Sequence, residues 1–178
     1  MQDCLQKIKL LALDVDGVLT DGTINIAGSG EIFKGFNAKD GLGISCAMRS
    51  GVQVAIITGR KSDIIHRRAA ELGITIICEG VHDKYTALVQ LTGELGLMRE
   101  NAAYIGDDLN DLPAFAAAGV SMVPQDAAAE VQAAADFVLA KSGGRGAVRE
   151  AVEMILTAQG KWSGIVAAYK ACGQGDRQ

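Results

Sequence analysis

Two aspartates, Asp14 and Asp16, stand two residues apart directly behind an apolar run at residues 8–13, which predicts a buried strand. Because side chains alternate along a strand, both carboxylates leave on the same side. In open α/β sheets, ligands bind outside the carboxyl ends of the strands. Two carboxylates placed there repel each other unless a cation or a proton lies between them. These residues alone leave a second interpretation open, a polar turn that pivots on Gly17.

Polar residues also follow the next three predicted strands. They are Thr58-Gly59-Arg60 after the second, Lys84 after the third, and residues 106–111, Gly-Asp-Asp-Leu-Asn-Asp, after the fourth. Each has an ordinary explanation by itself: a common turn, a solvated lysine, or an acidic first turn favoured by the helix dipole. Together, at one edge of one sheet, they add a hydroxyl, an ammonium and a third carboxylate to the first pair.

This set of groups fits phosphoryl transfer through an aspartyl phosphate. Asp14 would attack phosphorus, and Asp14 and Asp107 would bind the Mg²⁺ that offsets the negative charges. Thr58 and Lys84 would hold the phosphoryl oxygens in the transition state. Asp16 would protonate the leaving oxygen and then take a proton from the hydrolytic water.

The elements that must position these groups alternate along the chain, which predicts an α/β fold with a doubly wound parallel sheet. The predicted strands are 8–13, 53–57, 75–78, 102–105, 120–123 and 137–139. The predicted helices are 41–49, 62–72, 84–95, 111–117, 127–134 and 147–156. Residues 23–34 interrupt the alternation and predict a β-hairpin around a Gly-Ser-Gly turn, within a flap at 22–36.

We expect one domain over residues 1–160 and a partly helical tail over residues 161–178. In the tail, Trp162, Ile165, Val166 and Tyr169 fall on one helix face. This stripe packs either on the parent core or on a neighbouring subunit. The hairpin is too short to bury its own apolar side, so it is either a flap on the domain or a surface that pairs with other subunits.

Composition narrows the partners. The 178 residues are 49% hydrophobic and 21% charged, with a formal net charge of −4 and no basic block. An acidic chain of this kind argues against nucleic acid and acidic membranes as partners. No stretch is long and apolar enough to span a bilayer. No signal peptide is evident and the four cysteines form no C-x-x-C pair, so we expect a cytoplasmic protein with reduced thiols.

The four motifs, Asp14-Val15-Asp16-Gly17-Val18, Ile57-Thr58-Gly59-Arg60, Lys84 and residues 106–111, resemble those of the haloacid dehalogenase superfamily, in its order, over residues 8–140. The resemblance implies that Asp14 is the nucleophile and Asp16 the acid/base. It also implies that Mg²⁺ is bound by Asp14, Asp107 and the main-chain carbonyl of Asp16, with Asp108 and Asp111 supporting these groups from behind. The gaps between the motifs hold no cap domain, so the chain resembles a capless member.

Three further stretches resemble the family of 3-deoxy-D-manno-octulosonate (KDO) 8-phosphate phosphatases of lipopolysaccharide biosynthesis. They are Asp21-Gly22 with the hairpin, residues 36–41 (Phe-Asn-Ala-Lys-Asp-Gly) and residues 143–150. The resemblance implies a homotetramer assembled through the hairpin and a small phosphorylated sugar acid as substrate. The substrate-binding residues that it implies are Asp16, Asn37, Ala38, Lys39, Asp40, Gly41, Gly59, Arg60, Arg68, Lys84 and Asn110.

Other interpretations stay open at this point. Another sugar-acid phosphate, such as a nonulosonate 9-phosphate, would need the same chemistry. A phospho-receiver domain also uses Asp, Thr, Lys and Mg²⁺, but it has its acidic pair on the first strand and its phosphorylated aspartate in mid-chain. The alternative interpretation of Arg68 is an exposed surface charge. The alternative interpretation of Arg145, which lies among three glycines, is a residue at the tip of a loop.

Overall fold

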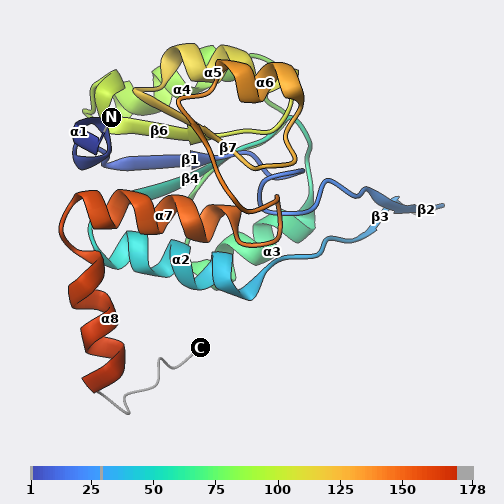
Figure 1. The fold of residues 1–178 in the computed structure, drawn as a ribbon. Coiled ribbons are helices and arrows are strands. Elements are labelled where there is room, and N and C mark those ends of the chain that lie inside the picture. The colour runs from blue at the N-terminus through green and yellow to red at the C-terminus, as the bar shows by residue number, and fades with distance from the viewer. Residues whose placement is uncertain (1, 29, 172–178) are drawn as a thin grey trace.

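The computed structural model describes residues 2–28 and 30–171, in which a parallel sheet lies between two layers of helices (Figure 1). The strand order is β5-β4-β1-β6-β7-β8, and every neighbouring pair is parallel. The strands are β1 (Leu10–Leu13), β4 (Gln53–Ile57), β5 (Ile76–Cys78), β6 (Ala102–Ile105), β7 (Val120–Val123) and β8 (Phe137–Val138). The doubly wound α/β fold is therefore confirmed.

Alternation along the strands builds two cores, one on each face of the sheet. In β1, Leu11 and Leu13 point into the first core, and Leu10 and Ala12 point into the second. The first core lies under α2 (Ala38–Arg49), α3 (Asp63–Leu72) and α7 (Ala147–Ala158). The second lies under α4 (Lys84–Glu94), α5 (Leu112–Ala117) and α6 (Ala129–Ala134). Because helices cover both faces of the sheet, the strands consist almost entirely of apolar residues.

The sheet order brings the polar strand ends together. β1 lies between β4 and β6, with Leu13 in register with Ile56 and Ile105. The residues that follow these three strands are thus neighbours at one edge of the sheet, although they are far apart in the sequence. This edge also receives the N-terminus of α4, where Lys84 is the first helical residue.

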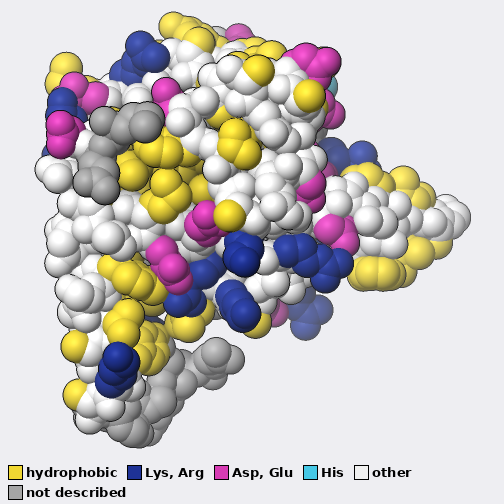
Figure 2. Space-filling model, viewed as in Figure 1, with side chains coloured by type: hydrophobic (Ala, Val, Ile, Leu, Met, Phe, Trp, Pro, Cys, Tyr) yellow, Lys and Arg dark blue, Asp and Glu magenta, His cyan; other side chains and the backbone are white. Residues whose placement is uncertain are grey.

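The hairpin is formed by β2 (Asn25–Ala27) and β3 (Gly30–Phe33), which pair antiparallel in a sheet of their own. It projects from the carboxyl edge of the main sheet (Figure 1). Ile26, Ile32 and Phe33 are each more than half exposed on it. Figure 2 shows hydrophobic side chains on both edges of this projection. The hairpin is confirmed, and its apolar side chains are uncovered in the single chain.

The N-terminal helix and the start of α2 differ most from the sequence-based expectation, while several other element ends differ by one or two residues. A short helix, α1 (Gln2–Gln6), was not predicted, and it packs against α7. Helix α2 begins at Ala38 rather than Gly41, because the side chain of Asn37 accepts a hydrogen bond from the Lys39 amide (2.8 Å) and caps the helix. Two 3₁₀ turns, η1 (Arg99–Asn101) and η2 (Leu109–Asp111), flank β6.

Helix α8 (Trp162–Ala171) carries the predicted apolar stripe and extends from the end of α7 away from the sheet (Figure 1). Trp162 and Ile165 pack against the first core, and the guanidinium of Arg149 lies 4.9 Å from the centre of the Trp162 ring. The division of the chain at residue 160 stays a prediction, and the tail beyond residue 171 lies outside the described residues. Among the described helices, none has the length and apolarity to cross a membrane.

Asp40, which the family resemblance implies as a substrate contact, is buried between α2 and α7. Its two carboxylate oxygens accept hydrogen bonds from the backbone amides of Gly146 (3.2 Å) and Arg149 (2.8 Å). Burial raises the pKa of Asp40, although these amide hydrogen bonds oppose the shift. The side chain thus satisfies two of the free N–H groups at the start of α7 and ties that helix to α2.

Replacing Asp40 tests this structural role. Asp40→Ala leaves two amides without their acceptor, so we expect the free energy of unfolding to fall by about 1–3 kcal/mol in urea denaturation. Asp40→Asn keeps one carbonyl oxygen and should lose less. If instead Asp40→Ala raised KM and left the unfolding midpoint unchanged, the residue would act as a substrate contact.

Candidate active site

A cleft of about 260 Å³ opens at the carboxyl edge of the sheet. It is lined by Asp14, Asp16, Gly22, Ile24, Thr58, Gly59, Arg60, Asp107, Asp108 and Asn110. Most of these residues were predicted as site residues, and they come from the ends of β1, β4 and β6. Gly22 and Ile24 were not predicted in this role, and they add the base of the hairpin to the wall.

Lys84 lies beneath the cleft, with 1% of its surface exposed. Its ammonium is 3.0 Å from Oδ2 of Asp14 and 2.6 Å from Oδ1 of Asp111. Burial alone would lower the pKa of Lys84, but the two carboxylates outweigh it and raise the pKa above its usual range. The lysine is therefore a fixed positive charge behind Asp14.

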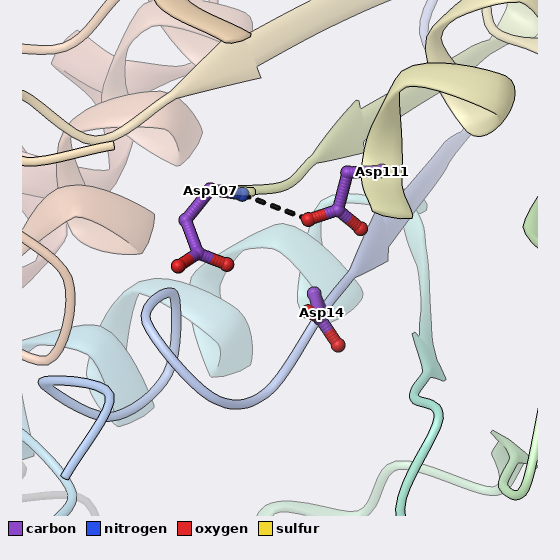
Figure 3. A group of neighbouring side chains, drawn as sticks. All are labelled: Asp14, Asp107 and Asp111. Atoms are coloured by element: carbon purple, nitrogen blue, oxygen red, sulfur yellow. Dashed lines mark hydrogen bonds between the residues drawn. The ribbon is translucent and has the colours of Figure 1, made fainter. Parts of the chain in front are cut away.

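Asp111 is completely buried and holds this edge together. Besides Lys84, its Oδ1 accepts the Tyr104 hydroxyl at 2.7 Å. Its Oδ2 accepts the backbone amides of Asp107 (2.9 Å) and Asp108 (3.3 Å); Figure 3 shows the first of these bonds. The contacts of Asp111 lie behind the cleft, whereas Asp108, which was expected beside it in a supporting position, lines the cleft itself.

Asp14, Asp107 and Asp111 lie close together, with carboxylate oxygens within 4.8 Å of one another (Figure 3). Both oxygens of Asp111 are already committed to hydrogen bonds, so Asp14 and Asp107 are the pair available to a metal ion. Burial, reinforced by nearby carboxylates, raises the pKa of Asp14 to about 6 and that of Asp107 to about 7. A hard divalent cation with oxygen ligands fits this pair, because its positive charge would stabilise the two carboxylates that burial and mutual repulsion destabilise.

Gly17 makes room for the Asp107 carboxylate. Its φ is +85°, and a Cβ added there would lie 1.9 Å from Oδ2 of Asp107. Glycine is thus required twice, for the left-handed backbone and for the close approach. The chain does turn at Gly17, as the turn interpretation expected. The same glycine also makes room for Asp107, a candidate metal ligand.

Asp16 turns its side chain toward the hairpin and the rim of the cleft. Its Oδ1 is 2.5 Å from the ammonium of Lys34, and its Oδ2 is 3.8 Å from Nε of Arg60. The two aspartates of the first motif are thus separated in role by their surroundings: Asp14 faces Lys84 and the other acids, and Asp16 faces two cations.

Thr58 is buried at the end of β4 and reaches the cleft with its side chain. Its Oγ1 accepts the backbone amide of Arg60 at 3.4 Å, and its own amide donates to the carbonyl of Cys78 at 2.9 Å. These contacts fix the turn that presents Gly59 and Arg60 to the cleft.

The remaining predicted substrate residues do not line this cleft. Ala38, Gly41 and Arg68 line a separate groove of about 800 Å³ between α2 and α3. Arg68 lies 5.6 Å from the centre of the Phe36 ring and pairs with Glu71 at 3.2 Å. The structure therefore does not bring Arg68 to the strand ends within one chain. Its substrate role, like those of Asn37, Ala38, Lys39 and Gly41, stays a prediction.

Comparison with known proteins agrees with this geometry. Residues 74–151 match the haloacid dehalogenase-like hydrolase family. The chain is 47% identical to the 3-deoxy-D-manno-octulosonate 8-phosphate phosphatase KdsC of Haemophilus influenzae, over 98% of this chain and 100% of that protein. It is also 47% identical to KdsC of Escherichia coli K12, over 88% of this chain and 83% of that one. The chain belongs to the KdsC family.

Solved structures of this family superpose closely. The cobalt-bound KDO 8-phosphate phosphatase of H. influenzae has a TM-score of 0.90 at 48% identity and covers 93% of this chain and 97% of its own. The Moraxella catarrhalis enzyme, solved in complex with magnesium, phosphate and KDO, has a TM-score of 0.91 at 45% identity and covers 94% and 97%. The fold of this KdsC family member is thus that of solved KDO 8-phosphate phosphatases.

Besides Gly22 and Ile24, three residues that the structure places next to the site were not expected from the sequence. Lys34 contacts Asp16, and Glu31 contacts Lys34, from a segment that gave no chemical signal; Tyr104 lies within an apolar strand. Only Tyr104 carried a hint, since a tyrosine in a fully buried strand needs a partner for its hydroxyl. The roles of Lys34 and Glu31 depend on how the base of the hairpin lies against the loop after β1, which only the tertiary structure shows.

The fit between Gly17 and Asp107 generates one prediction. Gly17→Ala places a methyl group where the Asp107 carboxylate lies, so we expect loss of Mg²⁺ binding and of activity by about 100-fold or more. Gly51→Ala is the matched control, because Gly51 has a similar φ of +86° but nothing within 4 Å of an added Cβ. Calorimetric Mg²⁺ titration of both variants checks this, and equal losses in the two would contradict it.

The raised pKa values of Asp14 and Asp107 predict how Mg²⁺ binding depends on pH. A protonated carboxyl does not bind the metal, so protons compete with Mg²⁺ increasingly as the pH falls through about 7 and then 6. We expect the affinity for Mg²⁺ to fall between about pH 8 and pH 6. The fall should be at most roughly tenfold per pH unit for each carboxyl group that becomes protonated. Calorimetry at both pH values measures it, and equal affinities would refute the raised pKa values.

Proposed function

We propose that this protein is a Mg²⁺-dependent phosphatase that hydrolyses KDO 8-phosphate to KDO and inorganic phosphate. The observation that most strongly supports this function is that Asp14, Thr58, Lys84 and Asp107 converge at the carboxyl ends of the strands. This arrangement occurs in a chain that is 47% identical to a KDO 8-phosphate phosphatase along almost its whole length. The magnesium, phosphate and KDO bound to the Moraxella relative support the same cofactor and substrate class.

Asp14 acts as the nucleophile. Lys84 holds its Oδ2, which leaves Oδ1 for the attack on phosphorus. The new Oδ1–P bond forms as the bond from phosphorus to the sugar oxygen breaks, and the product is an aspartyl phosphate. Thr58 donates its hydroxyl hydrogen to a phosphoryl oxygen, and the ammonium of Lys84 offsets the negative charge from below.

Asp16 moves the proton in both half-reactions. It gives a proton to the leaving sugar oxygen, so that the sugar departs as an alcohol rather than as an alkoxide. As a carboxylate, it then takes a proton from the water that attacks phosphorus. The P–O bond to Asp14 then breaks. This step releases inorganic phosphate and regenerates the free Asp14 carboxylate.

The residues that would hold Mg²⁺ are Asp14 and Asp107 through their carboxylates and Asp16 through its main-chain carbonyl. When bound, Mg²⁺ supplies the positive charge that lets an anionic carboxylate approach an anionic phosphoryl group. Gly17 keeps the backbone clear of Asp107, and Asp111 holds the Asp107 amide in place.

Arg60 lies on the rim of the cleft and suits the carboxylate of a sugar acid, because a guanidinium binds a carboxylate through two parallel hydrogen bonds. A nonulosonate 9-phosphate carries the same carboxylate and is the second candidate substrate. A phospho-receiver is less well supported, since the relatives are phosphatases and Asp16 would have no proton to transfer in a receiver.

We also place the enzyme in the cytoplasm. The exposed apolar side chains of the hairpin support assembly of a homotetramer through β2 and β3. Ile26, Ile32 and Phe33 are uncovered in the single chain, and burying them would stabilise an assembly. Light scattering should give a tetramer for the wild-type chain and a smaller species for Phe33→Glu. A wild-type monomer would refute this assembly.

A phosphate-release screen with Mg²⁺ tests the function. KDO 8-phosphate should give the highest kcat/KM among sugar-acid and simple sugar phosphates. Asp14→Asn should reduce the turnover number by about 10⁴-fold or more, because the amide is not a nucleophile. Asp63→Asn, an exposed aspartate outside the cleft, is the control and should stay fully active. Substantial turnover by Asp14→Asn would overturn the assignment of the nucleophile.

A further inference from the structure

Lys34 is a buried charge for which the mechanism above has no role. It follows β3 at the base of the hairpin, and 1% of its side chain is exposed. Its ammonium is 2.5 Å from Oδ1 of Asp16 and 2.9 Å from Oε1 of Glu31. Burial would lower the pKa of Lys34, but these two carboxylates outweigh burial and raise it. A lysine so enclosed remains charged because it is paired on two sides.

Lys34 does not line the cleft, and its ammonium is already held by two carboxylates. A substrate could reach it only after the base of the hairpin had moved. Its influence on the reaction therefore passes through Asp16, which does line the cleft.

The contact divides the two oxygens of Asp16 between different tasks. Oδ1 is occupied by Lys34, and Oδ2 lies 3.8 Å from Nε of Arg60, a residue that lines the cleft together with Asp16. The torsion of an aspartate carboxylate is broad when no partner fixes it. Holding one oxygen thus selects the other as the atom that exchanges the proton with the substrate.

Lys34 is itself held in place by the segment after β4. Glu31 pairs with Lys34 and accepts the hydroxyl of Ser62, the residue that precedes α3. Partial burial would raise the pKa of Glu31, but the Ser62 hydroxyl and the Lys34 ammonium outweigh it and lower the pKa. A continuous chain of polar contacts therefore runs from Asp16 through Lys34 and Glu31 to Ser62, two residues after Arg60.

We propose that Lys34 is a positioning residue for the proton transfer by Asp16, and that the hairpin takes part in catalysis through it. This inference rests on the proposed phosphatase function. Lys34 keeps its own proton throughout. Asp16 delivers the proton from Oδ2 to the leaving oxygen as the P–O bond breaks, while Lys34 holds Oδ1 in place.

A change of leaving group separates this role from a general structural one. The hydroxyl of a sugar leaves poorly as an anion and needs the proton from Asp16, whereas p-nitrophenolate or acetate leaves readily without it. The value of kcat/KM reports the steps up to the loss of the leaving group. A defect in proton delivery should therefore lower kcat/KM for a sugar phosphate much more than for p-nitrophenyl phosphate or acetyl phosphate.

The experiment compares wild type, Lys34→Met and Lys34→Arg as full-length chains with Mg²⁺. For Lys34→Met, we expect kcat/KM for KDO 8-phosphate to fall by about 10- to 100-fold. For p-nitrophenyl phosphate, or acetyl phosphate if the former is a poor substrate, it should change by less than about threefold. Lys34→Arg restores a donor to Asp16 and should regain most of the lost activity.

Lys7→Met is the control for loss of a lysine charge, because Lys7 forms an exposed pair with Glu100 at 3.3 Å, outside the cleft. Light scattering of each variant shows whether assembly is retained. Equal losses on both kinds of substrate, or no loss on either, would overturn the role of Lys34. If wild type does not hydrolyse KDO 8-phosphate, the proposed substrate fails, and the same comparison with the best primary sugar phosphate still decides the role of Lys34.

Discussion

The ammonium of Lys84 lies between the carboxylates of Asp14 and Asp111 in the buried floor of the cleft, and the rest of the site depends on this arrangement. Without the lysine, two adjacent carboxylates would stand in a medium of low dielectric, where their repulsion is strong. With it, Asp111 can accept the Tyr104 hydroxyl and the amides of Asp107 and Asp108. Two buried ion pairs that share Lys84 thus connect the ends of β1 and β6 with the start of α4.

The compensation by Lys84 is incomplete, and the remaining charge is what the chemistry uses. Asp14 and Asp107 keep raised pKa values, which means that the folded protein holds their charges at a cost. A divalent cation relieves that cost, whereas an anionic phosphoryl group does not. The charge of the site therefore favours binding of a cation over binding of an anion before any substrate contact forms. Local frustration of this kind is expected at functional sites, where stability is given up for reactivity.

Glycine provides the close approaches that bring the loops together. Gly17 admits the Asp107 carboxylate, and a Cβ on Gly143 would lie 1.8 Å from the carbonyl oxygen of Gly17. The loop that begins at Gly143 is anchored at the other end by Asp40, through the Gly146 amide. The stretch of residues 143–150 therefore packs against the loop after β1 and links it to the start of α2, which gives this part of the chain a structural role beside the site.

The sequence by itself determined the fold class and the groups at the strand ends, Asp14, Thr58, Lys84 and Asp107. It could do so because strand periodicity is local, and because parallel strands present their carboxyl ends at one edge. Only the tertiary structure decided which carboxylate partners which cation. Asp40 turned to the start of α7, Arg68 to a separate groove, and Asp16 to Lys34. These choices depend on side-chain orientation and on contacts between distant segments, and neither is encoded in the spacing of residues along one strand or helix.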